Sequence, residues 1–168
     1  MSFLESLSKQ INPRNVDINK VAYGTPGIDN QNELLIMLSK TTVPNHYKDI
    51  FICRAMTTKD NPVFAKPRTE NLVIWDCRDW YINKINHQKK RNYFIVPKDL
   101  AGDEIRTLSR VAILSQIENT KKSIKYYCDL LECPRSTFKD KYMITLDLFC
   151  KNIDNNLHNI EMQAQRMR

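Results

Sequence analysis

Glycine is scarce in this chain, with 3 residues in 168. So few glycines exclude a glycine-rich phosphate-binding loop and disfavour tight two-residue hairpins, whose turns need positive φ angles. No apolar run reaches the roughly 18 residues of a membrane span. The N-terminus also lacks the basic and apolar regions of a signal peptide. We therefore expect an intracellular, cytoplasmic protein without a membrane partner, with a place inside a virion as the other option.

Metal-binding and catalytic motifs are also lacking. The five cysteines include no CxxC pair and the three histidines are scattered, so neither a zinc site nor a disulfide framework is expected. Asp76 and Asp79 are a candidate Mg²⁺ pair, but the acidic-x-Lys sequence typical of nucleases is missing. The simpler interpretation pairs them with Arg78 or with nearby lysines, and places Trp75 and Trp80 in the core. We expect a protein that is not an enzyme, with no catalytic residues, no metal and no cofactor.

What the chain does contain is a globular composition with an excess of positive charge. Hydrophobic residues make up 42% and charged residues 27%, which are values of a folded domain. The net charge of +7 and the pI of about 9.2 favour an anionic partner, with nucleic acid the commonest. Abundant Asn, Ile and Lys, whose codons are A/T-rich, are compatible with a phage, a mobile element or a cell with an AT-rich genome.

The apolar pattern divides the chain into three parts. Residues 1–30 are expected to form an N-terminal helix, with Ser2 and Glu5 as its capping box, and an extended arm. Residues 31–98 are expected to form a helix followed by antiparallel strands. Residues 99–168 show a helical period throughout.

The expected strands are residues 49–56, 71–77 and 92–96, because each segment is rich in β-branched and aromatic residues. No helix-length segment separates them, which favours antiparallel pairing. The predicted fold class is therefore α+β, with a small antiparallel sheet followed by a C-terminal helical region that ends in a long helix.

The long terminal helix carries a narrow apolar stripe in its second half. Ile153, Leu157, Ile160 and Ala164 recur at steps of three or four residues in a polar surround. A narrow stripe on a helix that extends past its own domain favours a partner helix, from a second copy or from another protein. Packing along the chain's own sheet is the alternative.

Residues 127–138 (YCDLLECPRSTF) match the generic pattern of a helix-turn-helix. Cys128 is the small residue that allows two helices to approach, and the apolar positions are Tyr127, Leu131, Cys133 and Phe138. Residues 121–142 therefore resemble the helix-turn-helix class. Two residues differ from its pattern: Glu132 stands where glycine is preferred for a left-handed backbone, and Lys141 stands where an apolar residue is usual, although Tyr142 can replace it.

The resemblance implies that the second helix enters the major groove of duplex DNA. Arg135 would then bond guanine, and Ser136 and Thr137 would meet bases or phosphates. Phosphates would be neutralised by the lysines of the segment, which are Lys121, Lys122, Lys125, Lys139 and Lys141. The alternative is a plain αα-hairpin in which Pro134 starts the second helix and no base is read.

A second basic cluster, Lys89, Lys90 and Arg91, lies outside this segment. Residues 1–98 carry 15 basic against 9 acidic side chains, whereas residues 99–168 carry 11 against 10. With Tyr93 and Phe94 nearby, the cluster is a candidate contact for a nucleic-acid strand. A solvated hairpin tip is the alternative.

The leading functional hypothesis is a non-enzymatic DNA-associated protein that acts as an oligomer or in a larger complex, in transcription, replication or packaging. The second hypothesis is a structural or assembly subunit of a virion or other large complex. In that case the N-terminal arm and C-terminal helix hold the assembly and the hairpin reads no base.

Overall fold

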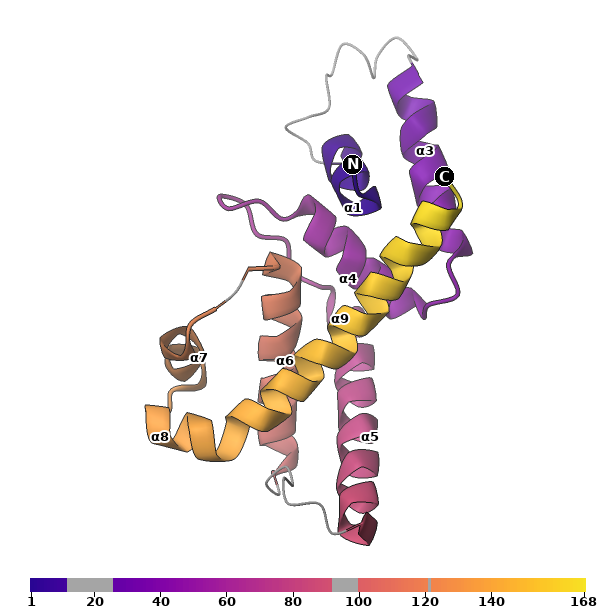
Figure 1. Ribbon diagram of the computed structural model, residues 1–168. Helices are drawn as coiled ribbons and strands as arrows, with labels where there is room; N and C mark the ends of the chain where they lie inside the picture. Colours follow the sequence, from indigo (N-terminus) through magenta and orange to yellow (C-terminus); the bar gives the residue numbers. More distant parts are fainter. Residues whose placement is uncertain (12–25, 92–99, 121) are drawn as a thin grey trace.

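The computed structural model describes residues 1–11, 26–91, 100–120 and 122–168, with the backbone alone for 26–32 and 86–91. In these residues the regular structure is entirely helical (Figure 1). The elements are α1 (Phe3–Ile11), α3 (Pro26–Lys40), α4 (Asn45–Met56), α5 (Pro67–Arg91), α6 (Gly102–Glu118), α7 (Ile124–Leu131), α8 (Arg135–Thr137), a π-helical turn η1 (Phe138–Tyr142) and α9 (Met143–Arg166). None of these helices combines the length and apolar character that a membrane span requires.

The predicted antiparallel sheet is wrong for the described residues. Residues 49–56 lie in α4 and residues 71–77 lie in α5, while residues 92–96 fall outside the described part of the chain. The protein is therefore all-α in this part and not α+β. The local preference of β-branched and aromatic residues for strands is weak, and tertiary packing overrides it here.

Burial along α4 shows why the helix is favoured. Tyr47, Ile50, Phe51 and Ala55 are at most 2% exposed, and their spacing of three and four residues places them on one helical face. A strand would have split this set between its two sides. Since all four contribute to the core, the helix buries apolar surface that a strand would leave exposed.

Helix α9 is the element against which most of the fold is packed. It contacts α1, α3, α4, α5 and α6, and it runs diagonally across the molecule in Figure 1. Its stripe is at most 3% exposed, at Leu146, Phe149, Ile153, Leu157, Ile160 and Ala164. The stripe that the sequence assigned to a partner helix is thus buried within its own chain.

The N-terminus of α1 is capped by residues from the beginning of the chain and by a residue near its end. Ser2 and Glu5 form the expected capping box, with hydrogen bonds of 2.9 Å from the Ser2 N–H and 3.1 Å from the Glu5 N–H. The Glu161 carboxylate on α9 also accepts hydrogen bonds from the N–H groups of Phe3 at 2.6 Å and Leu4 at 2.9 Å. Helix N-termini carry unpaired N–H groups and partial positive charge, so this carboxylate fixes α1 to α9.

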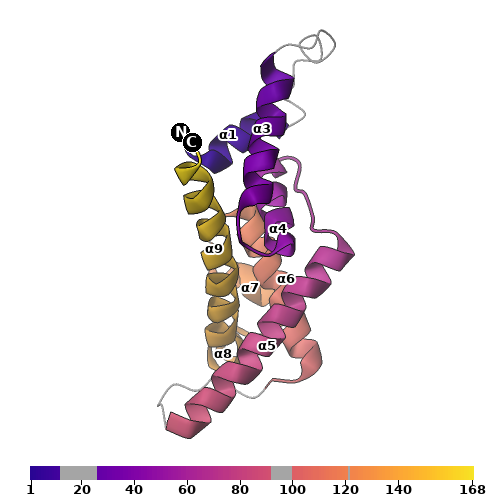
Figure 2. The same cartoon turned by 90° about the vertical axis from the view of Figure 1, so that its right-hand side faces the viewer.

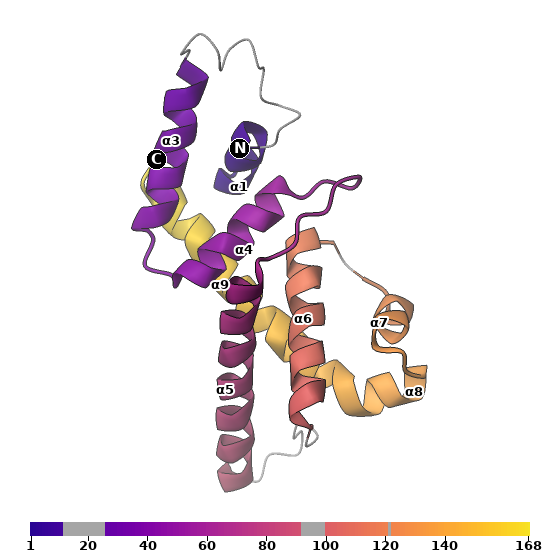
Figure 3. The ribbon, with the colours of Figure 1, turned by 180° about the vertical axis from the view of Figure 1, so that it is seen from behind.

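Helices α5 and α6 pack side by side with opposite chain directions (Figures 2 and 3). Val73, Cys77, Tyr81 and Ile85 form the buried face of α5. The end of α6 is held to α4 by Arg54, whose Nε donates to the Gln116 carbonyl at 2.6 Å.

A second polar contact joins α4 to α5. Asp76 Oδ2 lies 2.6 Å from His46 Nε2 and accepts a 2.9 Å hydrogen bond from the Tyr47 hydroxyl. Burial and the neighbouring Asp76 raise the pKa of Tyr47, so this phenol stays protonated and donates.

Phe149 offers a direct test of the packing on α9. Its ring is fully buried between Trp80 and Tyr81, with centroid separations of 6.2 and 6.4 Å. We expect Phe149→Ala to lower the free energy of unfolding by about 3–5 kcal/mol, because it leaves a cavity in the core. Ile144→Ala, at a 39% exposed position on the same helix, should cost under about 1 kcal/mol. Denaturant titration measures both, and equal losses would contradict the described packing.

Candidate nucleic-acid interface

The turn between α7 and α8 has the backbone that the helix-turn-helix pattern requires. Glu132 adopts φ 52° and ψ 44°, in the left-handed region. The N–H of the next residue, Cys133, donates to the Cys128 carbonyl at 3.1 Å, which closes the turn. Glu132 therefore departs from the pattern only in its side chain, because its backbone has the left-handed conformation that usually requires glycine.

Stacked aromatic rings form the interior of this corner. The rings of Tyr127 on α7 and Phe138 on η1 lie 5.8 Å apart and almost parallel, at 9°. Phe138 is 2% exposed, and the Tyr127 hydroxyl lies 3.0 Å from Ser115 Oγ on α6. Two of the pattern's four apolar positions thus join α7 to η1, and Tyr127 also links them to α6. We call residues 122–142 the α7–α8 corner.

The second departure, Lys141, is accommodated by the π-helical turn. Residues 138–142 follow a wider helix, in which the N–H of Met143 donates to the carbonyl of Phe138. One extra residue per turn places Tyr142 on the half-buried side and leaves Lys141 exposed. The same insertion keeps Phe138 in phase with Leu146 on the buried face of α9.

Two of the predicted phosphate-binding lysines are paired with carboxylates of α6. Lys122 forms an ion pair with Glu118 and lies 4.8 Å from the centroid of the Tyr126 ring. Lys141 Nζ lies 2.9 Å from Glu104 Oε2. Both cations hold the corner on α6, so they are less available to a ligand than the sequence suggested.

The remaining predicted residues divide into exposed, half-buried and undescribed ones. Thr137 is half-buried, and Lys121 lies outside the described residues. The exposed side chains are Lys125, Arg135, Ser136 and Lys139. Among the ion pairs of the described chain, none involves these three cations.

Acidic side chains reduce the positive potential of the corner. Asp129, Glu132 and Asp140 are exposed close to the three free cations in the sequence. The exposed surface therefore holds arginine and lysine side chains without a strong net charge. Long-range attraction of an anion would be weak, and specific contacts would have to supply the affinity.

The second basic cluster occupies a different setting from the predicted one. Lys89, Lys90 and Arg91 are the last residues of α5, and not a tip between two strands. Cations at a helix C-terminus interact favourably with the helix dipole, which accounts for their position without a ligand. Their side chains lie outside the described residues.

The interpretation of residues 75–80 needs correction as well. Asp76 bonds to His46 and Tyr47 rather than to Arg78, and Trp75 is 59% exposed rather than part of the core. Within the described residues, no group of three or more His, Cys, Asp and Glu side chains could hold a metal ion. The i, i+4, i+7 spacing of Asn71, Trp75 and Arg78 was the available signal for an exposed aromatic and basic face.

The left-handed residue at the turn makes a stability test possible. We expect Glu132→Gly to raise the free energy of unfolding by about 0.5–1 kcal/mol, because glycine adopts positive φ without strain. Asn119→Gly is the matched control, since Asn119 is the other non-glycine residue of the described segments with a left-handed backbone, and φ is 52° at both. Asparagine tolerates this region better, so the control should gain less. A loss of stability in Glu132→Gly, measured by thermal unfolding, would contradict the described turn.

The Lys141–Glu104 pair predicts a pH dependence. Burial opposes ionisation of Glu104, but hydrogen bonds from Lys141 and Tyr142 outweigh it and lower the pKa below 4.5. A carboxyl whose pKa is lower in the folded than in the unfolded state stabilises the fold at any pH above its unfolded-state pKa. This stabilisation is lost as the pH falls through the folded-state pKa. We expect Glu104→Gln to destabilise the protein at pH 7 and to do so much less at pH 3. Asp140→Asn, at an exposed carboxylate, is the control. If Glu104→Gln lowers the free energy of unfolding by the same amount at pH 7 and at pH 3, the proposed pH dependence is refuted.

Comparisons with known proteins identify no relative of the chain. No protein family, curated protein or solved structure gives a match to the chain. A functional hypothesis for this protein therefore depends on the chemistry of its own residues.

Proposed function

We propose that this chain is a non-enzymatic DNA-associated protein that contacts duplex DNA with the α7–α8 corner. The observation that carries the proposal is the left-handed turn at Glu132, which is followed directly by the exposed side chains of Arg135 and Ser136 at the start of the second helix. In helix-turn-helix proteins, the N-terminal residues of the second helix contact base edges in the major groove. The corner offers the same order of turn, helix start and exposed polar residues.

Each exposed residue has a role that fits its chemistry. The planar guanidinium of Arg135 can form two hydrogen bonds with guanine O6 and N7. Ser136 can donate to a base or a phosphate. Lys125 and Lys139 extend from the two helices and can each neutralise one phosphate.

The small number of free cations limits the affinity of one copy. Two contacts with phosphates, from Lys125 and Lys139, give a salt slope of only about −1.8 on logarithmic axes. Specific DNA-binding proteins commonly make more contacts, so we infer that this chain binds as an oligomer or within a larger complex. Transcription, replication and packaging are the processes that employ such factors.

A structural or assembly role is the second candidate, and exposed apolar side chains favour it. Leu130 on α7 and Met143 and Ile144 on α9 are 42%, 38% and 39% exposed. Leu130 lies in the corner and the other two follow it directly in the sequence, and all three leave apolar surface exposed to water in a single copy. A protein partner that buries them would use the corner without reading a base.

Electrophoretic mobility shifts with a mixed-sequence duplex over a salt series test the DNA proposal. We expect a shift at low salt with a slope of roughly −1.8 or steeper. Arg135→Ala should weaken binding by about 1–3 kcal/mol and remove a preference for guanine. Lys125→Gln should reduce the slope by about 0.9 and leave the base preference unchanged.

The matched control is Lys151→Gln, which removes one exposed positive charge from α9 outside the corner. This variant should retain the affinity and the base preference of the parent chain. Absence of any shift at low salt, or an Arg135→Ala variant that equals the control, would refute the proposal and leave the assembly role.

A further inference from the structure

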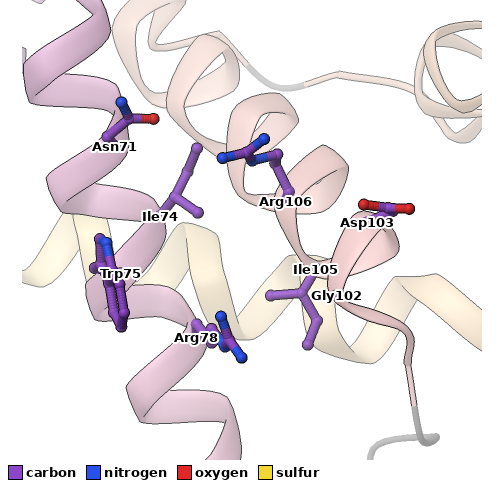
Figure 4. A pocket seen from close by; sticks show the side chains of 8 residues that line it. All are labelled: Asn71, Ile74, Trp75, Arg78, Gly102, Asp103, Ile105 and Arg106. Carbon is purple, nitrogen blue, oxygen red and sulfur yellow. The ribbon is translucent and has the colours of Figure 1, made fainter.

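A groove lies between α5 and α6, and its lining includes no residue of the α7–α8 corner (Figure 4). It measures about 410 Å³, within the range of small-ligand sites. The residues of α5 in its lining are Asn71, Ile74, Trp75 and Arg78, and those of α6 are Gly102, Asp103, Ile105 and Arg106. Ile74 and Ile105 are buried and form the floor, whereas the larger polar and aromatic residues form the rim.

Trp75 provides the groove with an exposed aromatic surface. With 59% of its surface exposed, it is the more exposed of the two tryptophans, because Trp80 is half-buried against Phe149. The guanidinium of Arg78 lies 5.8 Å from the centroid of the Trp75 ring. An indole in this position leaves apolar surface in water that a planar ligand could cover.

Two arginine side chains line the same groove. Arg78 belongs to α5, and Arg106 extends from α6 toward Ile74 (Figure 4). Neither forms an ion pair with a described residue. The contrast is Arg110, one turn further along α6, whose Nε lies 2.7 Å from Glu70 Oε1.

Asp103 is the single carboxylate among the lining residues, and its side chain points away from the indole in Figure 4. The groove therefore combines two unpaired cations with one aromatic surface, while its one acidic group lies to the side. This combination is complementary to a ligand that has both a planar aromatic group and negative charge. A nucleotide unit has both.

We propose that the α5–α6 groove binds single-stranded nucleic acid. One base stacks on the indole of Trp75, and the adjacent phosphates interact with Arg78 and Arg106. This site goes beyond the duplex contact proposed for the α7–α8 corner, because it involves other helices and another form of nucleic acid. A duplex keeps its bases stacked on one another and offers no free base surface. An acidic peptide would satisfy the guanidinium groups but would leave the indole without a planar partner.

Tryptophan fluorescence of the full chain tests the proposal, with an oligothymidylate of about 12 nucleotides as the probe. The chain has two tryptophans, so each variant isolates one of them. We expect quenching on titration of the parent chain and of Trp80→Phe, which retains Trp75. Trp75→Phe should give no quenching. Quenching that persists in Trp75→Phe, or its absence in the parent chain at low salt, would overturn the proposal.

Anisotropy of a labelled oligothymidylate gives a readout independent of tryptophan. Trp75→Ala, with helicity checked by circular dichroism, should bind about tenfold more weakly, as expected from the loss of one stacked base. The double variant Arg78→Gln/Arg106→Gln should lower the salt slope by about 1.4. Lys151→Gln, with a single charge removed elsewhere, should lower neither affinity nor slope. Equal effects in the control and the groove variants would refute the site.

Competitors and a corner variant separate this proposal from its alternatives. Unlabelled oligothymidylate should displace the labelled strand, whereas a duplex of equal length and a polyglutamate peptide should not. Displacement by polyglutamate at equal charge concentration would identify an acidic-peptide site and overturn the proposal. Arg135→Ala should leave single-strand binding unchanged, so that failure of the corner and failure of the groove are distinguishable.

Discussion

Burial of the apolar stripe of α9 is the interaction on which the rest of the structure depends. Helices α1, α3, α4, α5 and α6 all contact α9, and its stripe is almost completely removed from water. Helices α1, α3 and α4 lie near its C-terminal half, while α6 follows its N-terminal half and supports the corner (Figure 1). Because α6 lines the groove and anchors the corner, the packing of α6 on α9 influences where the residues of both candidate sites lie.

Helix α6 has a second role as the anchor of the α7–α8 corner. Ser115, Glu104 and Glu118 of α6 meet Tyr127, Lys141 and Lys122 of the corner. Two of these contacts use cations that the helix-turn-helix resemblance assigned to DNA. Two of the five described cations of the corner therefore hold it on α6, and the other three are the ones that a ligand would meet.

The sequence predicted individual helices better than it predicted their assembly. The capping box of Ser2 and Glu5 is local, so its pattern identified α1 correctly. Residues 49–56 were assigned to a strand because intrinsic preference was used where tertiary packing decides. A short apolar run is compatible with both a helix and a strand. Only the three-dimensional structure, in which the run is buried against several neighbouring helices, distinguishes the two.

In the candidate sites, too, the sequence predicted local features but not contacts between distant residues. The spacing of Tyr127, Cys128 and Phe138 is a local pattern, and the structure has a left-handed turn at the place it indicates. The pairing of Lys141 with Glu104 joins residues far apart in the sequence, and no local pattern reveals it. Trp75 was assigned to the core because tryptophan is usually buried, but its helix turns this face toward solvent.

The π-helical turn at residues 138–142 sets the angular phase between the corner and the buried stripe of α9. An α-helix rotates by about 100° for each residue. Removal of one residue from this turn would restore a regular α-helix, and Arg135 would then rotate by about that angle around the helix axis relative to the core. The direction in which the corner faces is therefore encoded in the count of residues within one turn, independently of their side chains.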